Sequence, residues 1–149
     1  MTATLHMGHI GLNVSDLARS KRFYQDLLGF ENKLESVEKG RKFVLLGRGE
    51  ELLLTLWEQS KGKYAPGQPG LHHLSFQAKS MDEVRTAESK LKALSIDFQY
   101  AGVVPHVEGS ASGGIFFHDP DGLRLEIFAP TGAEGKHAPV AGAPTCGFF

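Results

Sequence analysis

An internal repeat constrains the fold of this chain more than any other feature of its sequence. Residues 9–14 (HIGLNV) and residues 73–78 (HLSFQA) both begin with histidine and then alternate apolar with polar side chains. Successive side chains of a β-strand point to opposite faces, so each segment predicts a strand with one apolar face and with its histidine on the other face. A segment that recurs in this way predicts two copies of one structural module.

A helical pattern follows each of the two strands. In the first half, Ser15 or Asp16 can cap the helix and Gly29 can close it. In the second half, Ser80 and Glu83 have the spacing of a capping box. The apolar sides of the helices consist of Leu17, Phe23, Tyr24, Leu27 and Leu28 in the first and of Val84, Ala87, Leu91 and Leu94 in the second.

Three further strands are predicted after each helix, so the fold class is α+β with two β-α-β-β-β modules. These strands lie near residues 31–38, 42–46 and 52–57 in the first half and near 98–104, 114–118 and 123–128 in the second. We expect a single domain at residues 1–130, with module one at about 5–58, a Gly- and Pro-rich linker at 59–70 and module two at about 71–130. The tail at 131–149 is rich in Gly, Pro and Ala, and is either flexible or docked through Phe148 and Phe149.

The composition limits the classes of partner. The formal net charge is -1 and the pI is about 6.6, so no basic field exists to bind nucleic acid or an anionic membrane surface. No apolar run approaches membrane-spanning length. Cys146 is the single cysteine, which excludes an internal disulfide, favours a reducing compartment and makes a bystander thiol the simplest interpretation. We therefore expect a cytoplasmic protein with a small-molecule partner.

A carboxylate in the last predicted strand needs a partner. Glu126 lies between Leu125 and Ile127 in mid-strand, where burial of a charge is costly unless it is paired or bound to a metal. If the two curved mixed sheets turn their polar faces toward each other, His9, His73 and Glu126 meet in a cleft. Two imidazoles and one carboxylate suit a divalent Fe, Mn, Zn, Ni or Co ion and leave positions open for a substrate.

The chain resembles a known family, the vicinal oxygen chelate superfamily. The resemblance is carried by residues 9–17 (HIGLNVSDL), 23–30 (FYQDLLGF), 73–76 (HLSF) and 119–126 (DPDGLRLE). The superfamily includes glyoxalase I, extradiol dioxygenases, fosfomycin-modifying enzymes, methylmalonyl-CoA epimerase and bleomycin-resistance proteins. The resemblance implies the glyoxalase/bleomycin resistance/dioxygenase fold, metal ligands at His9, His73 and Glu126, and a homodimer.

The chain departs from particular branches of that superfamily. Its fourth ligand position falls on Thr55, where glyoxalase I has a carboxylate that also transfers protons, so the departure argues against a standard glyoxalase I. Fosfomycin thiol transferases have threonine at the position of Gly11. Extradiol dioxygenases carry an acid-base group near the metal, for which this sequence offers Tyr100, His106 and His118 as catalytic candidates. These comparisons do not select one reaction among those of the superfamily.

Strand parity also predicts which side chains line the cleft with the metal. The expected substrate-binding residues are Asn13, Leu53, Thr55, Trp57, Ser75, Gln77, Arg124 and Phe128. Arg124 would suit an anionic group of a substrate. Residues 108–114 are either a loop over the site or a long hairpin turn.

Three functions from different classes fit these features. The first is a metal-dependent lyase, isomerase or extradiol-type dioxygenase acting on a small molecule with adjacent oxygen atoms, which the metal binds as a Lewis acid. The alternative is a protein of the bleomycin-resistance type, which sequesters an aromatic natural product without catalysis and for which Trp57 and Phe128 are suited. A regulatory domain with a vestigial site is a third.

Overall fold

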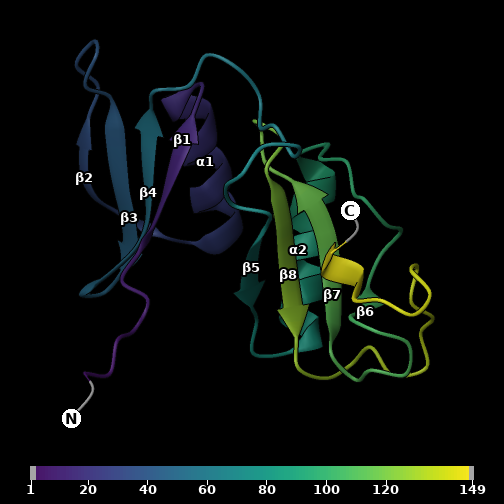
Figure 1. Cartoon of the computed structure of the whole chain (residues 1–149). Helices are drawn as coiled ribbons and strands as arrows, with labels where there is room; N and C mark the ends of the chain where they lie inside the picture. The colour runs from purple at the N-terminus through teal and green to yellow at the C-terminus, as the bar shows by residue number, and fades with distance from the viewer. Residues whose placement is uncertain (1–2, 148–149) are drawn as a thin grey trace. The chain divides into compact units, whose positions relative to one another are not determined.

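The structure, a computed structural model, describes residues 3–147 and divides into two compact units, Met1–Lys63 and Tyr64–Phe149. Within the described residues, each unit contains a four-stranded mixed sheet and an α-helix (Figure 1). The predicted α+β class with two β-α-β-β-β modules is confirmed. Phe148 and Phe149, considered above as a docking element, lie outside the described residues.

The sheet of the first unit has the strand order β1-β4-β3-β2. Its strands are β1 (Ile10–Val14), β2 (Glu31–Ser36), β3 (Phe43–Arg48) and β4 (Glu51–Glu58). β1 pairs with β4 in parallel, and the other pairs are antiparallel. The edge strand β2 is exposed along almost its whole length, and its charged residues suit an edge that has to avoid pairing with another sheet.

The sheet of the second unit repeats this topology, with the order β5-β8-β7-β6. Its strands are β5 (Leu74–Gln77), β6 (Val104–Pro105), β7 (Gly113–His118) and β8 (Arg124–Ala129). β5 pairs with β8 in parallel, and β7 pairs antiparallel with both of its neighbours. The sequence repeat therefore corresponds to a repeat of strand order and direction.

Both helices begin at the residues that the sequence indicates. Asp16 caps α1 (Leu17–Leu28) by accepting a hydrogen bond from the Arg19 backbone N–H at 2.9 Å, and Gly29 ends it with φ +66°. Ser80 caps α2 (Met81–Ala93) through the Glu83 N–H. The Glu83 carboxylate accepts from the N–H of Lys79, one residue earlier than in a standard capping box.

The core of each unit lies between its helix and one face of its sheet. In the first unit it contains Leu12, Val14, Leu17, Phe23, Tyr24, Leu27, Val44, Leu46, Leu54 and Leu56, and in the second Leu74, Val84, Ala87, Leu91, Ile115, Phe117, Leu125 and Ile127. These are the alternate strand positions and helical stripes that the apolar patterns predict. Leu94 is an exception, because it is the C-cap of α2 and is 43% exposed.

The predicted strand at residues 98–104 was wrong over most of its length. Phe98 makes an isolated bridge to Phe117, the chain then turns away, and pairing resumes only at Val104. Gly102, with φ +68°, permits the turn that breaks the strand. Residues 106–112 form a hairpin turn into β7, closed by a hydrogen bond from the His106 N–H to the Ser112 carbonyl at 3.0 Å.

The tail through Gly147 packs onto the second unit. Ala133 is fully buried and its N–H donates to the Ala111 carbonyl at 2.9 Å. The described part of the tail ends in a short 3-10 helix, η1 (Thr145–Gly147), shown in yellow in Figure 1. Over residues 3–147, no helix is long and apolar enough to cross a membrane.

Candidate metal centre

Glu126 is a carboxylate in the middle of a sheet. It lies in the inner strand β8, in register with Ser75 of β5 on one side and Phe116 of β7 on the other. Its neighbours Leu125 and Ile127 belong to the core, so strand alternation places Glu126 on the opposite face. The residue is only 2% exposed, and a buried carboxylate requires compensating partners.

One of these partners is His106, which follows directly after β6. Its Nε2 contacts Oε1 of Glu126, and its Nδ1 lies 2.8 Å from the hydroxyl oxygen of Ser112. The ring also packs edge-on against Phe128, with ring centroids 5.0 Å apart. His106 is thus fixed at both ring nitrogens and by an aromatic neighbour, and it holds the carboxylate in one orientation.

His73 faces the other oxygen of the same carboxylate. Its Nε2 lies 3.8 Å from Oε2 of Glu126, and its Nδ1 lies 2.9 Å from Nδ1 of His72. Burial lowers the pKa of His73, and the neighbouring His72 and Arg124 add to this effect, while Glu126 opposes it. The neutral imidazole that results is the form that binds metals.

A thiol from the tail lies in the same place. One ligand atom each from His73, Glu126 and Cys146 lie within 4.8 Å of one another. Burial raises the pKa of the Cys146 thiol, and the Glu126 carboxylate raises it further. Nitrogen, oxygen and sulfur donors around a buried negative charge are the chemistry of a transition-metal site.

The other predicted residues of the second unit lie around this cluster or further along its strands. Tyr100 packs edge-on against Phe116, and burial raises the pKa of its phenol. His118 is the last residue of β7 and lies in register with Arg124, which is two positions before Glu126 in β8. Burial lowers the pKa of His118. Ser75 and Gln77 are exposed and in register with Glu126 and Phe128.

The predicted residues of the first unit lie on or beside β1 and β4. His9 is exposed and directly precedes β1, as His73 directly precedes β5. The Asn13 side-chain oxygen accepts from the Gln59 N–H at 3.0 Å. Thr55 is buried, and its hydroxyl oxygen accepts from the Trp57 indole N–H at 2.9 Å. Leu53 is half-buried in the same strand.

A match to a family model decides to which family these two modules belong. The model of the Glyoxalase/Bleomycin resistance protein/Dioxygenase superfamily matches residues 6–127, from before β1 to the part of β8 that carries Glu126. The chain belongs to this superfamily.

The relatives of the chain include an uncharacterized protein and a manganese-dependent dioxygenase. The chain is 30% identical to the uncharacterized protein YaeR of Escherichia coli over 125 residues, which are 80% of this chain and 92% of YaeR. It is 29% identical to the manganese-dependent 2,3-dihydroxybiphenyl 1,2-dioxygenase of Geobacillus genomosp. 3, over 91% of this chain and 42% of that enzyme. The chain therefore spans less than half of that dioxygenase.

Solved structures of the superfamily share the fold. A glyoxylase/bleomycin resistance protein/dioxygenase domain from Frankia sp. EAN1pec superposes with a TM-score of 0.71 at 22% identity, covering 85% of this chain and 98% of that one. A mutant of the fosfomycin resistance protein FosX of Listeria monocytogenes, complexed with Mn(II) and 1S,2S-dihydroxypropylphosphonic acid, gives a TM-score of 0.65 at 24% identity, covering 88% and 95%. At these identities the likeness concerns the fold alone.

Sequence reasoning missed two features of this superfamily member's candidate centre. It named His106 as one of three catalytic candidates, with nothing in the sequence to show that the side chain faces the metal, and it predicted the strand to end at Val104. Alternation continued two residues further would have placed His106 on the face of Glu126. For Cys146 the sequence carries no such signal, since the Gly- and Pro-rich tail has no periodic pattern from which a face can be derived.

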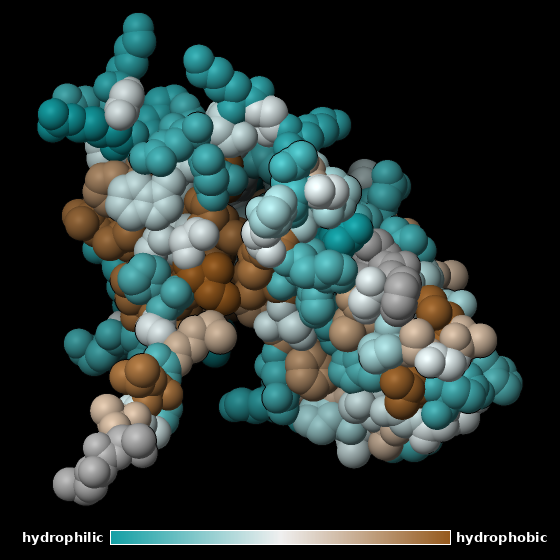
Figure 2. Space-filling model, viewed as in Figure 1, coloured by the Kyte–Doolittle hydropathy of each residue, from teal (hydrophilic) through white to brown (hydrophobic). Residues whose placement is uncertain are grey.

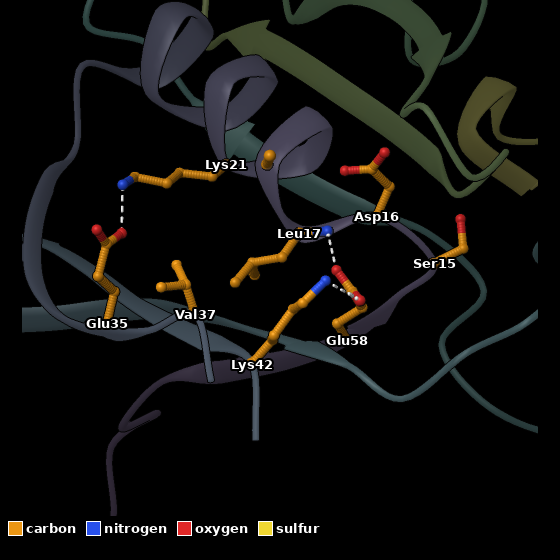
Figure 3. Close-up of a pocket in the computed structure, with 9 residues that line it drawn as sticks. Ser15, Asp16, Leu17, Lys21, Glu35, Val37, Lys42 and Glu58 are labelled. Atoms are coloured by element: carbon orange, nitrogen blue, oxygen red, sulfur yellow. Dashed lines mark hydrogen bonds and ion pairs between the residues drawn. The ribbon is translucent and has the colours of Figure 1, made fainter. Parts of the chain in front are cut away.

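The first unit also has a surface hollow of about 350 Å³ beside the start of α1 (Figure 3). Four of the charged groups that line it form two ion pairs, and a fifth, Asp16, caps α1 by accepting from the Arg19 backbone N–H. Lys21 contacts Glu35, and Glu58 accepts from the Lys42 ammonium and from the Leu17 backbone N–H, both at 2.8 Å. This arrangement ties the helix to the sheet and offers no set of converging ligand atoms, so it contributes to stability rather than to a site.

Proposed function

We propose that this protein is a metal-dependent enzyme of the superfamily that acts on a small molecule with adjacent oxygen atoms, with His9, His73 and Glu126 as the metal ligands. The observation that carries the proposal is the burial of Glu126 at 2% exposure with imidazoles directed at both of its oxygens. An isolated buried carboxylate would be costly, and a cation beside it removes that cost.

The donor set fits a divalent transition metal. Neutral imidazole and carboxylate suit Mn, Fe(II), Co, Ni and Zn. A manganese-dependent dioxygenase among the relatives and a Mn(II)-bound FosX among the structures support a metal of this group. Bound there, the ion would act as a Lewis acid toward the adjacent oxygens of the substrate.

The remaining side chains position the ligands and shape the surroundings. His106, held by Ser112, fixes the carboxylate so that its second oxygen faces His73. Phe128 covers the His106 ring and limits access of water to it. In this proposal His106 is the first candidate for the acid-base group, ahead of Tyr100 and His118, because it contacts the carboxylate of the proposed ligand Glu126.

Metal analysis tests the ligand assignment. The protein is purified without a metal-affinity tag or chelator, and the metal content of the wild type is compared with that of His9→Ala, His73→Ala and Glu126→Ala. His6→Ala, an exposed histidine before β1, is the matched control. We expect near-stoichiometric metal in the wild type and control and at least about tenfold weaker binding in the three variants. Full retention of metal by His73→Ala or Glu126→Ala contradicts the proposal.

Oxygen uptake with catechols as substrates then shows whether the protein belongs to the dioxygenase branch of the superfamily.

The rival function, sequestration of an aromatic compound without catalysis, is supported by an exposed aromatic group in the first unit. Trp57 is 37% exposed and its ring lies 5.1 Å from that of Phe43. Aromatic side chains with one open face bind flat ligands. Quenching of the fluorescence of this single tryptophan by aromatic antibiotics, equal in metal-stripped and metal-loaded protein, would favour the rival.

A homodimer is part of the proposal. Figure 2 shows hydrophobic side chains on the surface of the first unit, at the left, among hydrophilic ones. Its exposed large apolar residues include Leu34, Val37 and Trp57. Apolar groups left in water favour association with a partner. Light scattering on the purified protein measures the oligomeric state.

A further inference from the structure

The C-terminal tail is fixed to the second unit by specific contacts well before it reaches Cys146. The Glu108 carboxylate accepts from the Ala138 N–H at 2.7 Å and contacts Nδ1 of His137 at 2.8 Å. Ala133, nearer to β8, is buried. The tail therefore returns along a defined path and does not reach the centre as a loose end.

Thr145 anchors the residue next to Cys146. Its N–H donates to the His106 carbonyl at 2.7 Å, and its hydroxyl donates to the Pro105 carbonyl at 2.6 Å. Thr145 is fully buried, so these bonds are protected from competition with water. Because the His106 side chain contacts Glu126, the anchor sets the following residue, Cys146, beside the same carboxylate.

We infer that the tail supplies a metal ligand: the Cys146 thiolate, with His73 and Glu126, forms a three-donor site that lies wholly within the second unit. The three ligand atoms lie within 4.8 Å of one another. Ligand atoms held at about 2.0–2.3 Å from one ion are at most about 4.5 Å apart, so side-chain adjustments of the order of an ångström close the set. The inference rests on the proposed function for His73 and Glu126, and adds a sulfur donor to it.

The chemistry of the thiol follows from the metal. Coordination replaces the S–H proton by the metal ion and releases that proton to solvent, with no change of oxidation state. A thiolate makes the site favour thiophilic ions such as Zn²⁺, Co²⁺ or Cd²⁺ over Mg²⁺ or Mn²⁺.

A purely structural role for Cys146 makes a different prediction. The side chain also packs against a small buried cluster of Val104 and Phe116, with Tyr100 beside it. If packing were its only role, alanine or serine at this position would alter stability and leave the metal site unchanged. The two roles are therefore separated by a measurement on the metal itself.

Co²⁺ spectroscopy on the full chain provides this measurement. Apo protein is titrated with Co²⁺ in a phosphine reductant, so that Cys146 is the only thiol present. We expect a near-ultraviolet thiolate-to-Co²⁺ charge-transfer band in the wild type, its loss in Cys146→Ala and Cys146→Ser, and Co²⁺ binding at least about tenfold weaker in both. Thr145→Val, which removes the anchoring hydroxyl, should weaken the band while leaving the thiol in place.

His9→Ala separates this inference from the proposed function. We expect the band to persist in His9→Ala, since the three donors lie in one unit. Co²⁺ binding without the band in the wild type, together with loss of binding in His9→Ala, overturns the inference and leaves the proposed function standing. A band that persists in His73→Ala and Glu126→Ala overturns the three-donor site, and absence of any Co²⁺ binding overturns both.

Discussion

The Nε2 atom of His73 lies 3.8 Å from Oε2 of Glu126, while His106 occupies the other oxygen of the same carboxylate. The two imidazoles thus have different relationships to one buried charge. His106 is in direct contact and is held by Ser112, whereas His73 stands at a distance that a cation between the two groups would bridge. This asymmetry fits the proposed roles, in which His106 positions the carboxylate and His73 is a metal ligand.

Replacing His106 tests its role in positioning Glu126. His106→Ala removes the group that holds Oε1 and leaves the carboxylate free to rotate, so we expect metal affinity to fall by about 10–100-fold. His106→Gln keeps an N–H donor on a side chain of similar reach and should recover much of the loss. Competition titration with a chromophoric chelator measures both variants. Equal affinity of His106→Ala and the wild type would show that the contact has no influence on the metal.

Neutralising Glu126 should separate stability from metal binding. Glu126→Gln keeps the shape of the side chain and an acceptor oxygen for His106 while it removes a buried charge, so the unfolding free energy of the metal-free protein should change by about 1 kcal/mol, the typical net value of one hydrogen bond. If the proposed site binds metal, the wild type should gain thermal stability when metal is added, because the ion binds only the folded state, and the variant should gain none. Melting temperatures with and without metal provide the test, with Glu51→Gln, on an exposed residue of β4, as the control. An equal gain in the variant would exclude Glu126 as a ligand.

The sequence predicted most of the fold because the signals for it are local. Alternation in residues 9–14 and 73–78 depends only on which face of a strand meets the core, and the structure confirms it with Leu12, Val14 and Leu74 buried. The helix caps Asp16 and Ser80 are local as well, since each bonds a backbone group three residues away.

The parts that the sequence did not predict depend on long-range contacts. Cys146 reaches the centre because Thr145 bonds to Pro105, which is 40 residues earlier in the chain, and no periodic pattern encodes that contact. The break in the strand after Phe98 depends on a turn that includes Gly102, and a glycine can equally occur inside a strand.

Thr55 should control the environment of the only tryptophan. Thr55→Val keeps the branched shape and removes the acceptor of the Trp57 indole N–H. We expect the unfolding free energy to fall by about 1 kcal/mol, the typical net value of one hydrogen bond. The fluorescence of Trp57 should shift to longer wavelength and become easier to quench with acrylamide as the ring loosens. Thr86→Val, which removes a hydroxyl on the exposed side of α2, is a control that should leave the tryptophan emission unchanged.

The pH dependence of stability should carry a contribution from Glu58. The Lys42 ammonium, with the Leu17 backbone N–H at the start of α1, holds the pKa of Glu58 below its ordinary value of 4.5. A carboxylate whose pKa is lower in the folded state stabilises the fold above the unfolded-state pKa, and this stabilisation is lost as the pH falls through the folded-state pKa.

Glu58→Gln should therefore lower the unfolding free energy at neutral pH by about 1 kcal/mol, since the pair is partly exposed, and make the unfolding free energy fall less steeply in acid. Denaturant titrations at neutral and acidic pH, with Glu50→Gln in the exposed turn before β4 as the matched control, measure the difference. If the unfolding free energy of Glu58→Gln falls in acid as steeply as that of the control, the loss of stability in acid comes from other carboxylates.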